Sequence, residues 1–367
     1  MQFTSMQDII VPKLFGKDTN FSIFTYICNG KTINSQMKIL IDNAIPYIKG
    51  VFEPYAEVTY LDGKAFKPQD VATADALIIR TRTRCDEDLI GNSHVKIIST
   101  ATIGFDHIDL DFCAKRGIEV TTAQGCNAAG VLQWVAAALV ALSRKQGWKP
   151  QEKTLGIVGV GHVGSLVEQY ARAWGFHVLR CDPPRKQREG GDYVTLEEVL
   201  SQSNIITLHT PLDSTTFHMI DHKQISLLKP QATLINASRG EVASTEALLA
   251  ARQELILDVW EKEPEINTQL LRKAFLATPH IAGYSAQGKA NATKSVVEAV
   301  AHHFSLPIEN WYPPQVQSVE RKDITWDELY RTIDSYCDIQ SQSESLKLSA
   351  NDFESMRNNY NYRKEYF

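Results

Sequence analysis

Short runs of β-branched and aliphatic residues alternate with helical segments through most of this 367-residue chain, and the alternation limits the folds open to it. Between residues 154 and 279 the runs are TLGIVG, FHVLRC, NIITLH, ATLIN, LILDV and FLATP. Continuous apolar runs separated by helices are typical of parallel strands, because a helix usually makes the crossover between them. This part of the chain is therefore predicted to form a doubly wound α/β domain.

A first α/β unit precedes this series, with strands predicted at 38–42, 76–80, 95–99 and 118–121. A long apolar helix over 128–145 leads into the second series, and a helix over 286–304 is expected to cross back to the first unit. Residues 315–367 are polar with scattered aromatics, and they are predicted to form a small third module. Residues 1–36 do not join the pattern, and we expect them to be an extension of non-native or upstream-start origin.

One junction in the second series is irregular. The predicted helix TEALLAARQE runs straight into the strand LILDV, although connections of this kind usually take about 2–6 residues. The pattern indicates a deleted loop or residues missing from the chain. The connection after Leu212 also looks short.

Composition excludes several classes of protein. Hydrophobic residues make up 43% and charged residues 22%, as in globular proteins, and a net charge of −5 provides no basic field for nucleic acid or anionic membrane. The six cysteines lack zinc-ligand spacing, so we expect reduced thiols, no metal and a cytoplasmic protein. No apolar run is long enough for a membrane span, and no signal peptide is evident.

The segment GVGHVG provides Gly159, Gly161 and Gly164 directly after a predicted strand and at the start of a helix. These glycines allow a tight turn and a close approach of the backbone to a pyrophosphate. Asp182 ends the next strand, where its carboxylate can accept hydrogen bonds from the adenosine ribose and repel a 2′-phosphate, which favours NAD over NADP. Arg185 argues for NADP, and a ligand-free turn with a capping aspartate is the alternative interpretation.

Polar side chains follow three strands of the second series. They are Arg239 in NASRGEV, Asp258 and Glu263 in DVWEKEP, and His280 in TPHIAGYS. Because carboxyl ends of parallel strands face the ligand crevice, we expect these groups to converge on the nicotinamide. Arginine binds a carboxylate, histidine accepts a proton near neutral pH, and a glutamate stabilises the imidazolium. Oxidation of a 2-hydroxy acid needs these three functions.

At these residues the chain resembles the D-isomer-specific 2-hydroxyacid dehydrogenases, over about residues 38–304. The resemblance implies that Arg239 orients the substrate, Glu263 supports the histidine and His280 is the acid/base. The NAD contacts that it implies are Asp182, Thr210, Asp258 and Gly283. The alternative for Glu263, which precedes Pro264, is a solvated turn residue. The other histidines, including His107, His162 and His209, are interpreted as structural or surface groups.

Within the family, the chain is similar to members that oxidise a small phosphorylated 2-hydroxy acid. The similar segments are KILIDNAIPY, STATIGFDHID, QGCNAAGV, CDPPR, DVWEKEP, PHIAGYSAQGKA and FESMRNNYNYRKEY. The resemblance implies substrate contacts from Thr81, Thr102 and Tyr284. Alternating arginines in RTRTR, which would share one face of an extended segment, suit a phosphate or simply a solvated loop.

The resemblance also assigns the parts of the chain. Residues 128–285 are expected to form a Rossmann-type NAD domain, residues 37–127 with 286–305 a flavodoxin-like substrate domain, and residues 306–367 a dimerisation module of a homodimer. Aromatics in a segment too short for its own core are consistent with burial by a partner. Two alternatives stay open: another member such as a phosphoglycerate or hydroxypyruvate dehydrogenase, and a non-catalytic NAD-sensing interaction protein.

Overall fold

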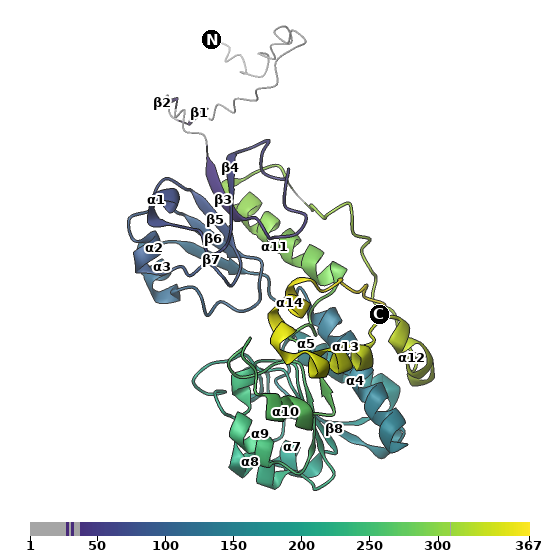
Figure 1. The fold of residues 1–367 in the computed structure, drawn as a ribbon. Helices are drawn as coiled ribbons and strands as arrows, with labels where there is room; N and C mark the ends of the chain where they lie inside the picture. Colours follow the sequence, from purple (N-terminus) through teal and green to yellow (C-terminus); the bar gives the residue numbers. More distant parts are fainter. Residues whose placement is uncertain (1–26, 29–30, 33–36, 309) are drawn as a thin grey trace, which may run out of the picture.

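A computed structural model describes residues 27–28, 31–32, 37–308 and 310–367, and it contains two parallel sheets, each flanked by helices (Figure 1). The predicted extension over residues 1–36 lies outside the described residues, except for the short antiparallel pair β1 (Ile27–Cys28) and β2 (Lys31–Thr32). The α/β class and the parallel pairing predicted from the sequence are confirmed.

The first sheet has the strand order β4-β3-β5-β6-β7. Its strands are β3 (Lys38–Asp42), β4 (Glu57–Leu61), β5 (Ala76–Ile79), β6 (Ile97–Thr100) and β7 (Glu119–Thr122). Alternate side chains enter two separate apolar clusters, with Leu77 on one face and Ile78 on the other, which explains the uninterrupted apolar runs. Strand β4 was not predicted, because its residues are partly exposed at the sheet edge.

Helices cover both faces of the first sheet. The short helices α1 (Pro68–Val71), α2 (Glu87–Ile90) and α3 (Leu110–Arg116) belong to one side. Helix α11 (Ala286–Phe304) comes from much later in the chain and packs Val296, Val297 and Val300 into the cluster on the other side. The crossing back predicted from the sequence is therefore confirmed, with the predicted bounds.

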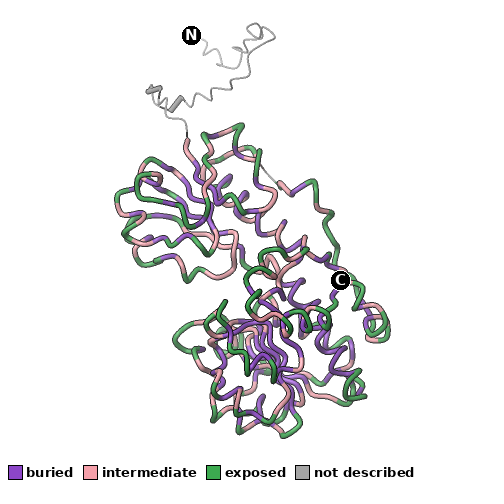
Figure 2. The backbone as a smooth tube through the Cα atoms, viewed as in Figure 1, coloured by how far each residue is buried: buried purple, intermediate pink, exposed green. Residues whose placement is uncertain are grey.

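The second sheet has the strand order β13-β12-β11-β10-β8-β9. Its strands are β8 (Thr154–Val158), β9 (His177–Cys181), β10 (Ile205–Leu208), β11 (Thr233–Asn236), β12 (Glu254–Leu257) and β13 (Leu276–Ala277). The helices between them are α5 (His162–Trp174), α6 (Pro183–Glu189), α7 (Leu196–Gln202), α8 (His222–Leu227), α9 (Thr245–Ala250) and α10 (Thr268–Lys273). Figure 2 shows buried backbone at the centre of this unit, where the inner strands β8, β10, β11 and β12 are mostly buried, whereas the edge strand β9 is partly exposed.

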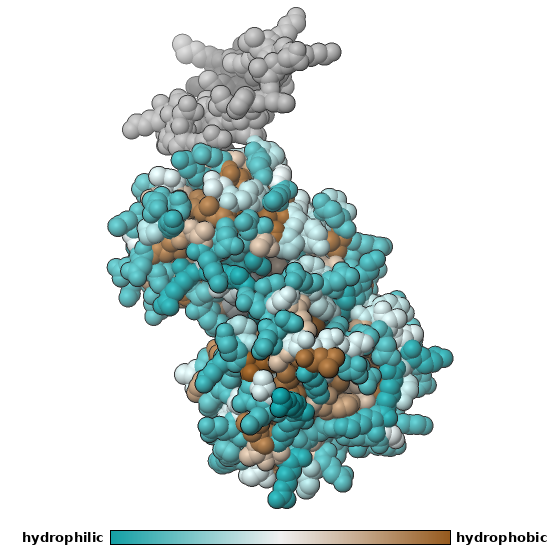
Figure 3. Space-filling view, in the orientation of Figure 1, coloured by the Kyte–Doolittle hydropathy of each residue, from teal (hydrophilic) through white to brown (hydrophobic). Residues whose placement is uncertain are grey.

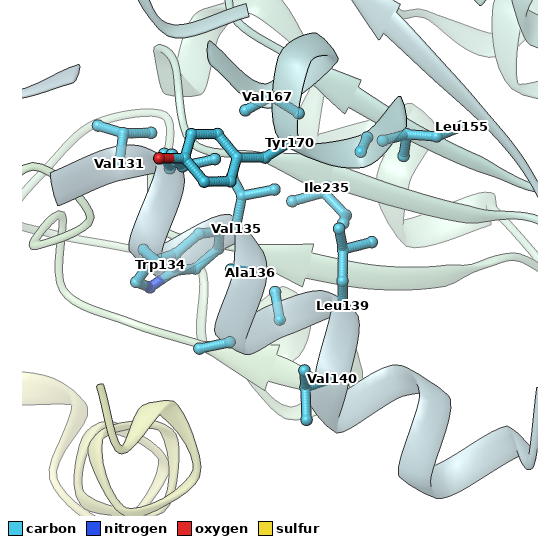
Figure 4. Close-up of a cluster of buried hydrophobic side chains, with 14 of the residues drawn as sticks. Val131, Trp134, Val135, Ala136, Leu139, Val140, Leu155, Val167, Tyr170 and Ile235 are labelled. Atoms are coloured by element: carbon cyan, nitrogen blue, oxygen red, sulfur yellow. The ribbon is translucent and has the colours of Figure 1, made fainter. Parts of the chain in front are cut away.

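Helix α4 (Ala128–Gln146) is the most deeply buried helix beside this sheet. Figure 4 shows Trp134, Val135 and Leu139 on α4 beside Tyr170 of α5 and Ile235 of β11. A helix that is apolar on most of its surface must be covered on most sides. The C-terminal part of the chain provides the additional cover.

The junction before β12 is an ordinary connection. Helix α9 ends at Ala250 rather than continuing to Glu254, and residues 251–253 connect it to β12. The side-chain amide of Gln253 donates to the carbonyl oxygens of Leu228 and Lys229 and holds this turn. The prediction of a helix running into a strand was therefore wrong, and the connection has a usual length.

The chain after α11 folds onto the second sheet and α4. Its helices are α12 (Trp326–Thr332), α13 (Ile339–Leu348) and α14 (Phe353–Asn358). Leu329 and Phe367 join the same apolar cluster as α4, and the indole of Trp174 donates to the carbonyl oxygen of Ile324 at 3.0 Å. Several of the aromatics that suggested burial by a partner are therefore covered within the chain.

The last residues of the chain are also bound tightly. The Arg363 guanidinium is buried and donates to the carbonyl oxygens of Ile281 at 3.0 Å and Gly130 at 2.8 Å, and also to that of Ala282. The backbone N–H of Ala286 at the start of α11 donates to the Arg363 carbonyl oxygen at 2.9 Å. The end of the chain thus connects α4, α11 and the loop between β13 and α11.

The surface of the molecule is mainly hydrophilic on the face seen in Figure 3, and apolar residues gather mostly over the unit of the second sheet. Leu348 is 86% exposed and Phe217 is 56% exposed. Among the described residues, no helix combines the length and the apolar character needed to cross a bilayer.

We predict that Phe367→Ala lowers the free energy of unfolding by about 3–5 kcal/mol, the usual cost of removing a buried phenyl ring. The ring is 1% exposed and packs against Tyr170 and Trp174. Phe217→Ala is the control, because substitution of an exposed side chain changes stability by less than about 0.5 kcal/mol. Urea unfolding followed by tryptophan fluorescence measures both variants. Equal stabilities would contradict this packing of the chain end.

Candidate active site

A cavity of about 380 Å³ is lined by segments of both sheet units. The first unit contributes the loop 103–106 after β6, and the second contributes residues that follow β10, β11, β12 and β13. The predicted site residues Thr210, Arg239, Asp258, His280, Gly283 and Tyr284 all line it. The carboxyl ends of the parallel strands therefore bring these side chains together, as the strand pattern predicted.

His280 and Glu263 form a hydrogen-bonded pair at the edge of this cavity. Nδ1 of His280 lies 2.7 Å from Oε2 of Glu263, and Nε2 has no hydrogen-bond partner among the residues described. The other carboxylate oxygen of Glu263 accepts the N–H of Trp260 at 3.0 Å, and the Glu263 side chain is only 17% exposed. Glu263 is therefore not a solvated turn residue. The pair leaves one imidazole nitrogen available to a ligand.

The surroundings of Glu263 favour its charged form. Burial alone would raise the pKa of Glu263. His280, Arg357 and the Trp260 N–H stabilise the carboxylate more strongly, so the pKa of Glu263 falls below its ordinary value. Glu263 is thus a carboxylate at neutral pH. The negative charge of Glu263 next to the Nδ1–H group of His280 fixes the tautomer of the neutral imidazole and stabilises the imidazolium.

Asp258 holds the loop that carries His280. Its carboxylate accepts the hydroxyl of Thr278 and the N–H groups of Ile281 and Ala282, at 2.5, 2.8 and 2.9 Å. The N–H of His280 donates to the Asp258 carbonyl oxygen at 2.7 Å. Burial raises the pKa of Asp258, although the hydrogen bonds act in the opposite direction. The role seen in the structure is to position the loop, while the expected contact with NAD stays a prediction.

Arg239 projects from the start of the 3-10 helix Gly240–Val242 into the cavity. One terminal nitrogen donates to the Ser238 carbonyl oxygen at 2.8 Å. The other faces Gly104 of the first unit, where a Cβ atom in place of the glycine hydrogen would lie 2.8 Å from it. Gly104 therefore leaves room for the guanidinium between the two units.

The glycine-rich loop has the shape that a pyrophosphate requires. Gly159 has a φ of +85°, and a Cβ atom at Gly164 would lie 2.0 Å from the Gly159 carbonyl oxygen. A Cβ atom at Gly161 would meet nothing within 4 Å, so the approach to the N-terminus of α5 is open. Thr210 Oγ1 is buried and has no partner among the described residues. These features fit a dinucleotide in the groove.

Asp182 has the capping role, and its expected contact with the adenosine ribose stays a prediction. Its carboxylate oxygens accept the N–H groups of Val160 at 2.8 Å and Arg185 at 2.9 Å, so it caps α6 and braces the glycine loop. Each oxygen keeps a further lone pair that a ribose hydroxyl can use. The Arg185 guanidinium is occupied by Val160, Ser165 and Glu189 and does not lie free for a 2′-phosphate.

The two predicted threonines lie outside the residues that line the cavity. Thr102 Oγ1 is bonded to Thr100 Oγ1 and to the Gly104 carbonyl oxygen, and it supports the loop that faces Arg239. Thr81 is exposed in the turn after β5. The structure therefore gives Thr102 a supporting position and gives Thr81 no contact with the cavity.

The arginines of RTRTR do not share one face. Strand β5 ends at Ile79 and the chain then turns, with the Thr83 N–H donating to the Arg80 carbonyl oxygen at 3.2 Å. Arg80, Arg82 and Arg84 each pair with a different carboxylate, on Asp42, Glu354 and Asp86 respectively. The condition for a common face, an extended segment, is therefore not met.

Sequence reasoning missed two basic residues next to the site. Arg357 of α14 donates from Nε to the Tyr284 hydroxyl at 3.1 Å, and its Nη1 lies 3.7 Å from Glu263. Lys289 of α11 lies over the Tyr284 ring, 3.9 Å from its centroid. Both lie in segments that resemble the family, PHIAGYSAQGKA and FESMRNNYNYRKEY. Local sequence patterns, however, do not show that Arg357 lies close to Glu263 in the fold.

The histidines interpreted as structural include two in the cavity wall, His162 and His209. His209 is fully buried, and burial lowers its pKa to about 3, so it is neutral at pH 7. The His162 ring fills the space that a Cβ atom at Gly125 would need. These contacts are consistent with packing roles.

Comparison with known proteins agrees with this geometry. Residues 127–282 match the family model of the D-isomer specific 2-hydroxyacid dehydrogenase NAD binding domain. The chain is 45% identical to an erythronate-4-phosphate dehydrogenase from Bacteroides fragilis, over 90% of this chain and 97% of that protein. It is 37% identical to the Escherichia coli protein of that name, over 90% and 92%.

Solved structures share the arrangement of the two units. A 3-phosphoglycerate dehydrogenase with bound NAD⁺ from Entamoeba histolytica matches 78% of this chain and all of its own, with 26% identity and a TM-score of 0.64. A D-lactate dehydrogenase from Aquifex aeolicus has the same fold, with a TM-score of 0.58 at 24% identity, over 77% of this chain and all of its own. From its sequence relatives, the chain belongs to the D-isomer-specific 2-hydroxyacid dehydrogenase family, among the erythronate-4-phosphate dehydrogenases.

Proposed function

We propose that this enzyme uses NAD to oxidise the 2-hydroxyl of 4-phospho-D-erythronate, giving 2-oxo-3-hydroxy-4-phosphobutanoate for vitamin B6 biosynthesis. The observation that carries the proposal is the His280–Glu263 pair beside Arg239 in the cavity, in a chain 45% identical to a protein named for this activity. The three side chains provide a base, its tuning charge and a cation for a carboxylate.

The reaction needs the 2-hydroxyl to lose its proton while C2 loses a hydride. NAD supplies the hydride acceptor when it is bound. Nε2 of His280 accepts the hydroxyl proton, and Glu263 stabilises the imidazolium through Nδ1–H. Arg239 holds the C1 carboxylate and so orients C2 in the cavity.

The remaining contacts follow from the same assignment. NAD is held by Gly159, Gly161 and Gly164 at its pyrophosphate and by Asp182 at its adenosine ribose, with further contacts from Thr210, Asp258 and Gly283. Support comes from the open approach at Gly161 and from the unpartnered buried hydroxyl of Thr210 within the described residues. Tyr284, which lines the cavity, is assigned to the substrate, whereas the contacts implied for Thr81 and Thr102 have no support from the cavity lining.

The assembly that we propose is a homodimer, with residues 306–367 at its interface. Support comes from family membership and from exposed apolar side chains in this part of the chain, such as Leu348 at 86%. We place the enzyme in the cytoplasm, which is consistent with free thiols at Cys85, Cys113 and Cys337. The proposed division into a substrate domain, 37–127 with 286–305, and an NAD domain, 128–285, follows the two sheets.

The homodimer is testable on the full chain by light scattering coupled to size-exclusion chromatography. We expect twice the mass of one chain, and Leu348→Glu should weaken association by placing a charge in the interface. Leu110→Glu, at an exposed apolar residue outside residues 306–367, is a control for the charge itself. A monomeric mass at all concentrations would contradict the dimer.

A panel of 2-hydroxy acids tests the substrate. We expect NAD reduction with 4-phospho-D-erythronate at a kcat/KM far above that with 3-phosphoglycerate or glycerate, and a clear preference for NAD over NADP because Asp182 opposes a 2′-phosphate. Absorbance of the reduced cofactor at several substrate concentrations gives the comparison. If 3-phosphoglycerate reacts best, the enzyme is a different dehydrogenase, and if no acid reacts, an NAD-sensing role is favoured.

The roles of the pair can be separated by substitution. His280→Ala should reduce kcat by about 10²–10⁴-fold, the usual contribution of a general base, while NAD affinity stays nearly unchanged. Glu263→Gln removes the charge that stabilises the imidazolium, so the acidic limb of the kcat profile for oxidation should shift to lower pH. Turnover against pH and NAD titration by fluorescence give the readouts. Near-normal turnover of His280→Ala at neutral pH would place the base elsewhere.

A further inference from the structure

Lys289 is a partly buried cation without an acidic partner among the described residues. It projects from the first turn of α11, and its ammonium lies 3.9 Å from the ring centroid of Tyr284 and 5.4 Å from that of Tyr362. Burial, together with the charges of Arg80 and Arg357, lowers the pKa of Lys289 to about 8, although Cys126 acts in the opposite direction. Cations removed from water are normally paired with an anion. The described residues therefore provide no anion that pairs with Lys289.

Two arginines from distant parts of the chain act electrostatically on Lys289, and Arg357 also contacts Tyr284. Arg80 follows β5 of the first unit, and it uses only Nε in its ion pair with Asp42, at 3.2 Å. Arg357 of α14 uses Nε for the Tyr284 hydroxyl, and its Nη1 is 3.7 Å from Glu263. Within the described part of the chain, three cations thus surround Tyr284 and Tyr362, and their ion pairs involve only two carboxylates. The excess of positive charge over negative charge in this cluster favours the binding of an anion.

This cluster adjoins the cavity through Tyr284, which lines the cavity wall four residues after His280. Arg239 occupies another part of the same cavity and is assigned to the C1 carboxylate. A substrate with a carboxylate at one end and a dianionic phosphate at the other needs two separate cationic positions. Arg239 provides one in the cavity, and the cluster around Lys289, which does not itself line the cavity, provides the other where Lys289 contacts Tyr284.

We propose that Lys289, with Arg80 and Arg357, binds the phosphate group of the substrate, while Tyr284 forms the wall against which the carbon chain lies. The proposal rests on the proposed oxidation of a phosphorylated 2-hydroxy acid and assigns the residues that select for the phosphate. Lys289 provides a compact charge, and the terminal nitrogens of Arg80 provide directed donors. The subsite is assembled from the first unit, α11 and the C-terminal segment.

Lys289→Gln tests this assignment, because it removes the charge and keeps most of the side-chain volume. We expect kcat/KM for 4-phospho-D-erythronate to fall about 10- to 100-fold, mainly through KM, as for the loss of one charged hydrogen bond. The value for unphosphorylated D-erythronate should stay unchanged. Lys289→Arg should recover much of the loss. Lys294→Gln is the matched control, because Lys294 lies on the same helix and pairs with Glu298 at the surface.

Calorimetry with inorganic phosphate on the NAD-loaded protein gives a second readout that does not require turnover. Wild type should bind phosphate at least tenfold more tightly than Lys289→Gln, and Lys294→Gln should match wild type. If wild type oxidises the phosphorylated acid and Lys289→Gln is equally efficient, the subsite is wrong and the proposed function stands. Equal losses with both acids would make Lys289 structural. Failure of wild type with every acid would instead overturn the proposed function.

Discussion

The buried carboxylate of Asp258 is the interaction on which the catalytic geometry depends. It accepts hydrogen bonds from the N–H groups of Ile281 and Ala282 and from the Thr278 hydroxyl. These bonds hold the loop between β13 and α11 in place. His280 lies in this loop with a φ of +56°, a strained conformation that the anchored neighbours maintain. Without the anchor, neither the hydrogen bond to Glu263 nor the direction of Nε2 into the cavity would be fixed.

A second constraint acts between the two units. The Arg239 guanidinium belongs to the second unit but faces Gly104 of the first, and the hydroxyl of Thr102 holds the Gly104 carbonyl oxygen. Helix α11 begins beside the His280 loop and packs its apolar side chains against the first sheet. The position of the Arg239 guanidinium against the loop 103–106 therefore depends on the placement of one unit against the other, whereas Arg239 and His280 are held by the same sheet.

Much of the fold followed from the sequence, because buried parallel strands and the apolar helices α4 and α11 have strong local patterns. The glycine loop and the groups after the strands were also predictable, since their positions in a doubly wound sheet determine where they meet. Edge strand β4, the turn at Arg82 and the end of α9 at Ala250 were not, because partial exposure or tertiary contacts decide them. Arg357 reaches the site only through the folding of the chain end.

The hydrogen bonds of Arg363 tie the end of the chain to the carbonyl oxygens of Ile281 and Gly130, next to the catalytic loop. During synthesis, Arg363 emerges from the ribosome after both sheets. The loop that carries His280 therefore gains this support later than the strands that position it. A product that stops between Asn358 and Arg363 would contain every residue assigned to catalysis and would still lack the brace that holds the loop in place.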